Sequence, residues 1–188
     1  MDESTSVGEI TFTAFDFETT GLNPADDAIC EIGAVQFRGG EVIDTFQTLA
    51  NPGMKVSADA RAISGLSNQQ LAAAPPVNEV LPDFLEFIED RVLAAHNAEF
   101  DMGFLRAAIQ TYSLSPIRNL IVDTQALAEK AFPRKRSYSL QALAEQLGVD
   151  PGAAHRALDD ALTCMKVFNA CVDQLSFMGD LPLSEVLR

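Results

Sequence analysis

Basic residues are scarce in this chain of 188 residues. It has 13 lysines and arginines against 27 aspartates and glutamates, which gives a formal net charge of −14. A protein that holds nucleic acid mainly by releasing counterions needs a basic surface, so the composition argues against that class of binder. It leaves room for an enzyme that holds a few phosphates through metal ions and backbone amides.

Cysteine is also sparse, and long apolar runs are absent. Cys30, Cys164 and Cys171 form an odd, scattered set that fits neither a disulfide framework nor a zinc site. We therefore expect reduced core thiols in a cytoplasmic protein. No apolar run approaches the roughly 20 residues that span a membrane, and the acidic residues 1–6 do not resemble a secretory signal. The 47% of hydrophobic residues favours one domain with a sizeable core.

Two acidic residues, Asp16 and Glu18, lie two positions apart at the end of a mostly apolar run that starts at Ile10. A strand over residues 10–18 would direct both carboxylates to one face, because side chains alternate along a strand. Like charges on a core strand are costly unless a cation cancels them, and oxygen ligands suit Mg²⁺ or Mn²⁺. An Asp-x-Glu pair also arises by chance on solvated faces, but here a strand precedes it and a turn follows, as at ligand sites of α/β proteins.

The rest of the pattern predicts a mixed sheet flanked by helices. Two further strands, joined by a Gly39-Gly40 hairpin, complete an antiparallel meander over residues 29–38 and 41–49. Strands then alternate with helices, an order typical of α/β domains. We expect short strands at 91–95 and 119–123, and helices at 57–63, 67–75, 76–88, 102–110, 124–131, 139–147 and 156–175.

More acidic residues lie near the predicted helix starts. Asp101 precedes the helix at 102–110, where the role of an N-cap would by itself explain an aspartate. His155 and Asp160 would lie about 140° apart on one helix, so they can reach one point only if His155 is in the loop before it. Periodicity does not separate Asp160 from Asp159. These acids with one histidine are the set that two-metal phosphoryl hydrolysis needs, in which a neutral imidazole deprotonates water.

In combination, these segments resemble the DEDDh 3′–5′ exonucleases, the family of the proofreading (epsilon) subunit of bacterial DNA polymerase III. Three blocks occur in the family's order: Asp16-x-Glu18 in Phe-Asp-Phe-Glu-Thr-Thr-Gly, Asp101 in His-Asn-Ala-Glu-Phe-Asp, and His155-x-x-x-x-Asp160. The segments Glu31–Val35 and Val122–Ala128 resemble the parts between these blocks. The similarity spans about residues 10–172, nearly the whole chain.

The resemblance implies an RNase H-like α/β fold with a central five-stranded mixed sheet flanked by helices. It implies two Mg²⁺ or Mn²⁺ ions and His155 as the general base. The implied metal ligands are Asp16, Glu18, Asp101 and Asp160. Asp159 then becomes a solvated neighbour, because the family's ligand follows the histidine by five positions. The implied activity is hydrolysis of the terminal phosphodiester, which releases 5′-mononucleotides from DNA 3′ ends.

The resemblance also implies a binding place for the 3′-terminal nucleotide. Backbone amides of Thr19, Thr20 and Gly21 would approach the nucleotide, with further residues near the site. These further residues are Leu22, Phe100 and His96, of which His96 is expected to be architectural rather than catalytic. The chain departs from the family at Ser64, where many members carry a histidine that helps to receive the nucleotide. Contacts to the nucleotide should therefore differ at Ser64.

The sequence leaves three activities open. The first is a DNA 3′–5′ exonuclease, either a proofreading subunit or a stand-alone repair relative. The second is an RNA-trimming exonuclease, RNase T-like or oligoribonuclease-like. The third is a catalytically idle binding module, which the intact set of costly acids disfavours.

The chain divides, by expectation, into a flexible segment 1–9, an exonuclease domain 10–175 and a tail 176–188. The expected substrates are single-stranded 3′ ends of DNA, or of RNA. The partners considered are a DNA polymerase subunit and a sliding clamp, because Gln174–Met178 resembles clamp-docking peptides. No membrane partner is expected.

Overall fold

A five-stranded sheet forms the centre of the molecule in the computed structural model, which describes residues 2–152 and 155–187. The strands are β1 (Phe12–Thr19), β2 (Ile29–Arg38), β3 (Glu41–Leu49), β4 (Val92–Ala95) and β5 (Ile121–Asp123). Their order is β3-β2-β1-β4-β5. The β1–β2 and β2–β3 pairs are antiparallel, whereas β1–β4 and β4–β5 are parallel. The predicted mixed sheet and its antiparallel meander are confirmed.

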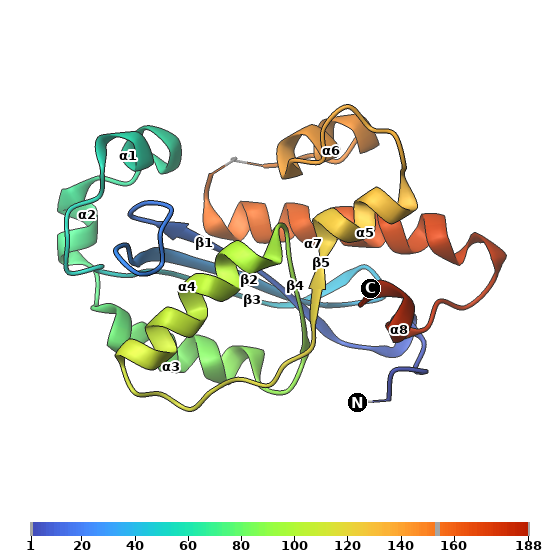
Figure 1. Ribbon diagram of the computed structural model, residues 1–188, viewed down its shortest axis with the longest axis horizontal. Coiled ribbons are helices and arrows are strands. Elements are labelled where there is room, and N and C mark those ends of the chain that lie inside the picture. The colour runs from blue at the N-terminus through green and yellow to red at the C-terminus, as the bar shows by residue number, and fades with distance from the viewer. Residues whose placement is uncertain (1, 153–154, 188) are drawn as a thin grey trace.

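Helices cover both faces of the sheet (Figure 1). One face carries α5 (Thr124–Ala131), α6 (Leu140–Leu147) and α7 (Ala157–Leu175), and the other carries α3 (Val77–Ile88) and α4 (Ala98–Thr111). Two short helices, α1 (Ala58–Ser64) and α2 (Asn68–Ala73), pack beyond one end of β2, and α8 spans Leu183–Val186. Short 3₁₀ helices span Val7–Glu9 and Ser176–Met178. Within the described residues, no helix has the length and apolar character that crossing a bilayer requires.

The alternation of side chains along β1 separates the two cores. Phe12 and Ala14 belong to the core under α7, whereas Phe17 belongs to the core under α3 and α4. Asp16 and Glu18 continue the row of Phe12 and Ala14, because every second side chain of a strand points to the same face. The strand therefore directs both acids to the face that α7 covers, as their spacing predicts.

One helix begins earlier than predicted, and this changes the setting of Asp101. The helix expected from residue 102 begins at Ala98, after Asn97 in the left-handed conformation (φ 61°). The carboxylate of Asp123 accepts hydrogen bonds from the amides of Asn97 and Ala98, both at 3.2 Å. Asp101 therefore lies inside the first turn of α4 and is not its N-cap. A left-handed residue leaves no mark in apolar periodicity.

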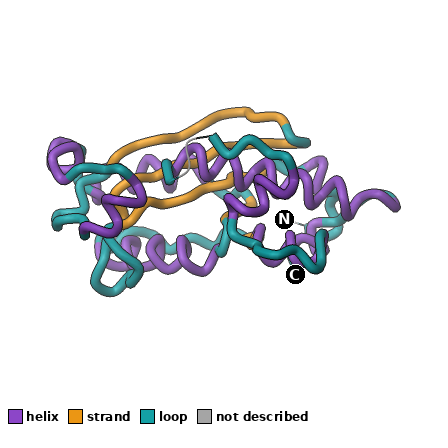
Figure 2. Tube along the Cα trace, turned by 90° about the horizontal axis from the view of Figure 1, so that it is seen from above, coloured by secondary structure: helices purple, strands orange, loops and turns teal. Residues whose placement is uncertain are grey.

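The two ends of the chain pack against each other and lie close together in both views (Figures 1 and 2). The amide of Val7 donates to the carbonyl of Leu181 at 2.9 Å, and Leu183 is buried in the core under α7. Glu3, Thr5 and Val7 make such backbone contacts with residues 181–184, and the flexibility expected of the segment 1–9 stays a prediction. Residues 1 and 188 of the predicted end segments lie outside the described residues, and the boundaries at 10 and 175 stay a prediction.

Helix α7 approaches the sheet most closely at Gly33 of β2. A Cβ atom at this position would overlap backbone atoms of Ala157 and Leu158 at the start of the helix. Backbone atoms cannot swing aside as a flexible side chain can, so glycine is required here. The first turn of α7, which carries Asp160, is therefore seated directly on the sheet.

The change Gly33→Ala should lower the free energy of unfolding by about 1–3 kcal/mol, because the added methyl group overpacks the contact between α7 and β2. Urea unfolding followed by circular dichroism measures the loss. Gly103→Ala is the matched control, since its Cβ would meet Pro24 at an ordinary 3.5 Å within a helix that favours alanine. Equal stability of the two variants would contradict this account of the helix seat.

Candidate active site

Four carboxylates come together where β1 extends beyond its parallel neighbour. The ladder with β4 covers only Phe12–Ala14 of β1, so Asp16 and Glu18 lie past its end. There the first turn of α4 replaces the missing strand, because Asp101 Oδ1 accepts the amide hydrogen of Phe17 at 3.0 Å. The fourth carboxylate, Asp160, comes from the first turn of α7.

His155 lies in the loop before α7, which meets the condition for it to share a site with Asp160. It has a left-handed backbone (φ 63°), and its amide donates to Asp160 Oδ2 at 2.9 Å. One ligand atom each from Glu18, His155 and Asp160 lie within 4.8 Å of one another. Asp160 is buried and also accepts from Gln141 Nε2 at 2.7 Å, whereas Asp159 is only half-buried. The geometry therefore favours Asp160 over its neighbour as the site residue.

The four clustered acids, of which Asp101 and Asp160 are buried and Asp16 and Glu18 half-buried, carry raised pKa values. Burial, more than any neighbour, raises the pKa of Glu18 to about 7, and the charges of Asp160 and Glu31 add to the rise. Burial likewise raises the pKa of Asp101 to about 7. The pKa of Asp16 lies well above its ordinary range, through burial first and then the charges of Asp101 and Asp160. The pKa of Asp160 is raised mainly by burial.

The raised pKa values of these carboxylates indicate whether the residues fit metal ions. Carboxylates that crowd together in a desolvated place favour their protonated forms unless positive charge is supplied. Hard oxygen donors in this number are the ligands that small divalent cations take. The donor set therefore fits divalent cations, and Glu18, Asp160 and His155 offer ligand atoms within 4.8 Å of one another.

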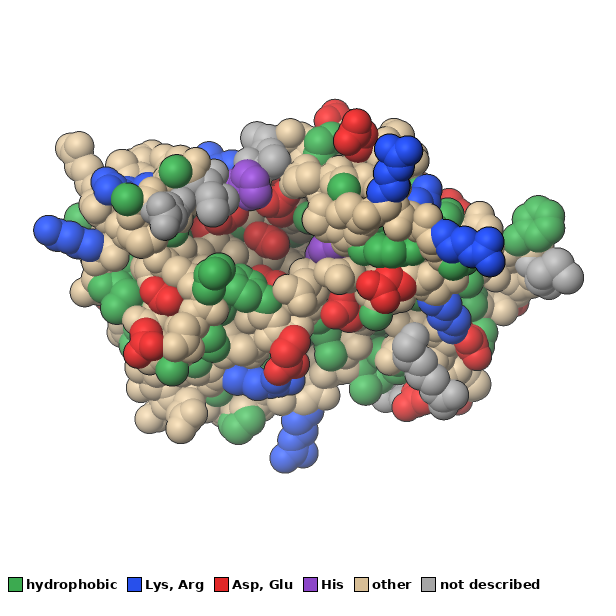
Figure 3. Space-filling view, turned by 45° about the horizontal axis from the view of Figure 1, so that its top comes forward, with side chains coloured by type: hydrophobic (Ala, Val, Ile, Leu, Met, Phe, Trp, Pro, Cys, Tyr) green, Lys and Arg blue, Asp and Glu red, His purple; other side chains and the backbone are tan. Residues whose placement is uncertain are grey.

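A cavity of about 350 Å³ adjoins the acids. Its lining is formed by Phe17, Glu18, Thr19, Gly21, Leu22, Ser57, Ala60 and Phe100. Four of the residues predicted to contact substrate therefore line one cavity beside Glu18. In the space-filling view, acidic and histidine side chains gather around a hollow on this face (Figure 3). The sequence did not indicate Ser57 and Ala60, because the start of α1 reaches this wall only through the tertiary fold.

Thr20 and Ser64 are also predicted to contact substrate. Their hydroxyl groups form hydrogen bonds within the protein. Thr20 is buried, its amide, which is predicted to approach the nucleotide, donates to the carbonyl of Ala28 at 2.9 Å, and its Oγ1 donates to Asp27 Oδ1 at 2.9 Å. Ser64 is buried as well, and its Oγ donates to the carbonyl of Ala60 at 3.0 Å. Neither residue is part of the cavity lining, so nothing in the geometry of these side chains favours a substrate contact.

His96 is held by the protein through both ring nitrogens. Nε2 lies 2.8 Å from the carbonyl of Tyr138, and Nδ1 lies 2.9 Å from Thr124 Oγ1. A carbonyl can only accept, so Nε2 carries the proton, and burial lowers the pKa of the ring and keeps it neutral. This arrangement favours the architectural role over a substrate contact.

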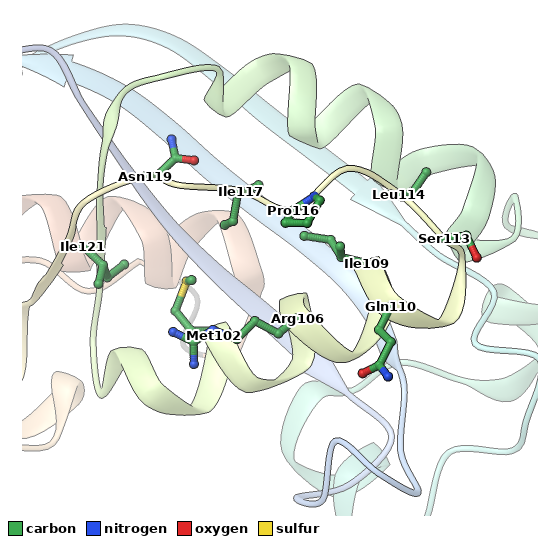
Figure 4. A pocket seen from close by; sticks show the side chains of 10 residues that line it. All are labelled: Met102, Arg106, Ile109, Gln110, Ser113, Leu114, Pro116, Ile117, Asn119 and Ile121. Atoms are coloured by element: carbon green, nitrogen blue, oxygen red, sulfur yellow. The ribbon is translucent and has the colours of Figure 1, made fainter.

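A larger cavity, of about 470 Å³, lies away from the acids between α4 and the segment 113–121 (Figure 4). Its lining is mostly apolar, and Met102 and Ile109 of α4 face Ile117 across it. None of the clustered carboxylates takes part in it. The clustered acids with raised pKa values, and not the larger cavity, therefore mark the candidate active site.

Comparison with known proteins agrees with this geometry. Residues 13–168 match a family described as "Exonuclease", and the chain belongs to this exonuclease family. Its relatives include the DNA polymerase III PolC-type protein of Thermotoga maritima, which is 41% identical over 186 residues. That match covers 99% of this chain but 14% of the PolC-type protein. DNA polymerase III subunit epsilon of Treponema pallidum is 42% identical over 165 residues, which cover 87% of this chain and 77% of that subunit.

Solved structures share the fold at lower sequence identity. Exonuclease X in complex with 5′-overhanging duplex DNA has a TM-score of 0.73 and 23% identity, over 94% of this chain and 99% of that one. The nuclease domain of 3′hExo, a DEDDh family member bound to rAMP, has a TM-score of 0.75 and 22% identity, over 92% and 94% of the two chains. The RNase H-like fold implied by the sequence is therefore confirmed.

The metal-free protein should lose stability as the pH rises from about 4 to about 7. The folded state holds the protons of Glu18 and Asp101 up to a pKa of about 7, whereas the unfolded chain releases them near their ordinary pKa of about 4. The stability that these bound protons contribute is therefore fully present below the pKa of the unfolded chain. It is lost as the pH rises to the pKa of the folded protein. Thermal unfolding in EDTA should show a melting temperature that falls by several degrees, since about 1 kcal/mol corresponds to about 2–4 °C at this chain length.

The control for this prediction is Asp16→Asn, which removes one of the acids whose pKa is raised and with it that acid's share of the proton release, so it should flatten the decline. Excess Mg²⁺ or Mn²⁺ at pH 8 should raise the melting temperature of the unaltered protein more than that of Asp16→Asn. The same slope with pH in both proteins would refute the electrostatic account.

Proposed function

We propose that the chain is a divalent-metal-dependent 3′–5′ exonuclease that releases 5′-mononucleotides from DNA 3′ ends. The observation that carries the proposal is the convergence of four carboxylates, two buried and two half-buried, with His155 next to Glu18 and Asp160 and a cavity of nucleotide size beside them. A module that only binds a partner would gain nothing from burying repelling acids, because their desolvation costs free energy without return. The family membership of the chain supports the same conclusion.

Each residue of the proposed machinery has a part that its position supports. Two Mg²⁺ or Mn²⁺ ions, held by Asp16, Glu18, Asp101 and Asp160, would supply Lewis acidity at the scissile phosphodiester. His155 is exposed at the edge of the acid cluster and takes the proton of the attacking water. The new bond joins that water oxygen to phosphorus, and the bond from phosphorus to the 3′ oxygen of the preceding nucleotide breaks.

Glu18 connects the chemistry to the substrate in this proposal. It belongs to the ligand group with His155 and Asp160 and also to the lining of the 350 Å³ cavity. The terminal nucleotide would occupy that cavity, with its phosphate toward Glu18. Leu22 is 83% exposed and Phe100 half-buried, so both offer apolar surface to a base.

A DNA substrate is supported by relatives that are named as DNA polymerase III proteins. The chain spans 14% of the length of the PolC-type relative but 77% of the epsilon subunit, so a part of a larger polymerase and a small subunit both remain candidates for the working form. We assign the chain to proofreading or DNA repair on this basis. We also propose a cytoplasmic location, which is consistent with a role in replication.

Asp16→Ala should abolish nucleotide release while the protein stays folded, because the change removes a proposed metal ligand and also a repelling charge. The measurement is release of labelled 5′-mononucleotides from single-stranded DNA and RNA of matched sequence, with Mn²⁺ present. We expect a rate loss of at least about 10³-fold on DNA, in line with losses of essential catalytic groups. Asp159→Ala is the matched control and should retain most of the activity.

The same assay separates the alternatives. Faster release from RNA than from DNA would favour the RNA-trimming enzyme, and no release from either strand would leave only the idle module. Full activity of Asp16→Ala would contradict the proposed site.

A sliding clamp or a polymerase subunit is the proposed protein partner. The segment Gln174–Met178 lies at the end of α7, where Gln174 is exposed and Phe177 is 87% exposed. The ring of Phe177 is therefore open to a partner, as a docking role for this segment requires.

Changing Gln174 and Phe177 together to alanine should weaken binding to the clamp of the host at least about tenfold, as loss of an aromatic anchor does at interfaces. Surface plasmon resonance with immobilised clamp measures the effect, and exonuclease activity should be unchanged. Leu22→Ala, another exposed apolar side chain, is the control. Equal affinity of the double variant and the unaltered chain would remove the clamp from the proposal.

A further inference from the structure

Glu31 of β2 is a fully buried carboxylate beside the acid cluster that the sequence analysis left without a role. It is the cross-strand partner of Glu18. Its Oε1 accepts from Gln47 Nε2 at 3.0 Å and from Arg156 Nη2 at 2.9 Å. Its Oε2 accepts from Arg156 Nε at 3.2 Å and from the amide of Ala157 at 3.4 Å. Four donors fill the acceptor positions of the carboxylate, so Glu31 is unsuited to be a fifth metal ligand.

Arg156 follows His155 directly and joins this loop to the sheet. Its two hydrogen bonds to Glu31 form a bidentate pair, which fixes the direction of both side chains as well as their distance. The Arg156 side chain is 42% exposed, whereas Glu31 is completely buried, so the pair is anchored at its sheet end. The loop is thus tied to a residue that cannot move without disturbing β2.

The backbone of His155 needs such an anchor. A left-handed conformation costs a non-glycine residue free energy, so the surrounding contacts must hold it in place. On one side its own amide is held by Asp160 Oδ2, and on the other the next residue is held by Glu31. The imidazole itself is exposed. Among the described residues, the hydrogen bond of the His155 amide and the Arg156–Glu31 pair are therefore the contacts that fix its direction.

We infer that Glu31 and Arg156 are positioning residues, which hold the His155 loop so that the imidazole stays directed at the acid cluster. The inference rests on the proposed exonuclease function, in which His155 is the base. A base displaced by about 1 Å can lose about 10²-fold in rate, so the effect should appear in kcat. Substrate affinity should change little, because the cavity lining contains neither residue.

The test compares Arg156→Ala and Arg156→Lys with the unaltered full chain. Arg156→Ala should lower kcat on single-stranded DNA about 10–100-fold with KM within about threefold. Arg156→Lys should lie between, since an ammonium restores the charge but not the two parallel hydrogen bonds. In metal-free protein, the His155 amide should exchange with solvent at least about tenfold faster in Arg156→Ala, because its hydrogen bond to Asp160 depends on the loop position.

Lys130→Ala is the matched control. It breaks the ion pair of Lys130 with Glu185 (2.6 Å), which joins α5 to α8 away from the acids, and it should alter neither kcat nor the exchange of His155. Unchanged kcat and exchange in Arg156→Ala would overturn the inference. A fall in kcat without faster exchange would overturn it too, because Arg156 would then act on the substrate and not through His155.

The two proposals fail in different ways. If the unaltered chain releases no nucleotide, the proposed function fails, yet amide exchange in metal-free protein still tests whether the pair holds the loop. If Arg156→Ala is too unstable to measure, Arg156→Lys gives the same two readouts. Arg156→Lys with unaltered kcat and exchange would also count against the inference, since a bidentate pair is what it requires.

Discussion

The structure depends on one electrostatic constraint, the crowding of four buried or half-buried carboxylates at a single point. Burial is the largest cause of the raised pKa values of Asp16, Glu18, Asp101 and Asp160, and the charges of nearby carboxylates add to the rise at each of them. A fold can sustain this arrangement only if the surrounding elements are rigid and if cations relieve it in use.

The sheet brings the acids together because its strands differ in length. Strand β1 extends beyond the end of β4, and its two acids lie on this extension. There Asp101, in the first turn of α4, accepts the hydrogen bond from the Phe17 amide that a neighbouring strand would otherwise accept. Gly33 lets the start of α7 rest on β2, which brings Asp160 and the His155 loop down to the same point. The buried Glu31 then ties that loop to the sheet through Arg156. The site is therefore a meeting of three element ends and not a property of any one segment.

Much of this could be predicted from the sequence, because its strongest signals are local. The strands at 29–38 and 41–49 and the helix at 124–131 have the predicted bounds, since apolar periodicity and glycine turns define them. The spacing of His155 and Asp160 correctly required a loop before the helix. The start of α4 was missed, because a left-handed Asn97 has no signature in periodicity. The roles of Glu31 and Gln141 were missed as well, because each depends on a register or a contact between distant segments. For Ser64 the family comparison pointed to the site, but its hydroxyl bonds within its own helix.

The central claim is that divalent cations complete this charge cluster. Isothermal titration calorimetry of Mn²⁺ into the metal-free chain at pH 7, in buffers of different ionisation enthalpy, tests it most directly. With pKa values of about 7, Glu18 and Asp101 are partly protonated at that pH and must release protons when ions bind. The account predicts saturable binding of two ions per chain with proton release into the buffer. Absence of saturable binding, or binding without proton release, would contradict it.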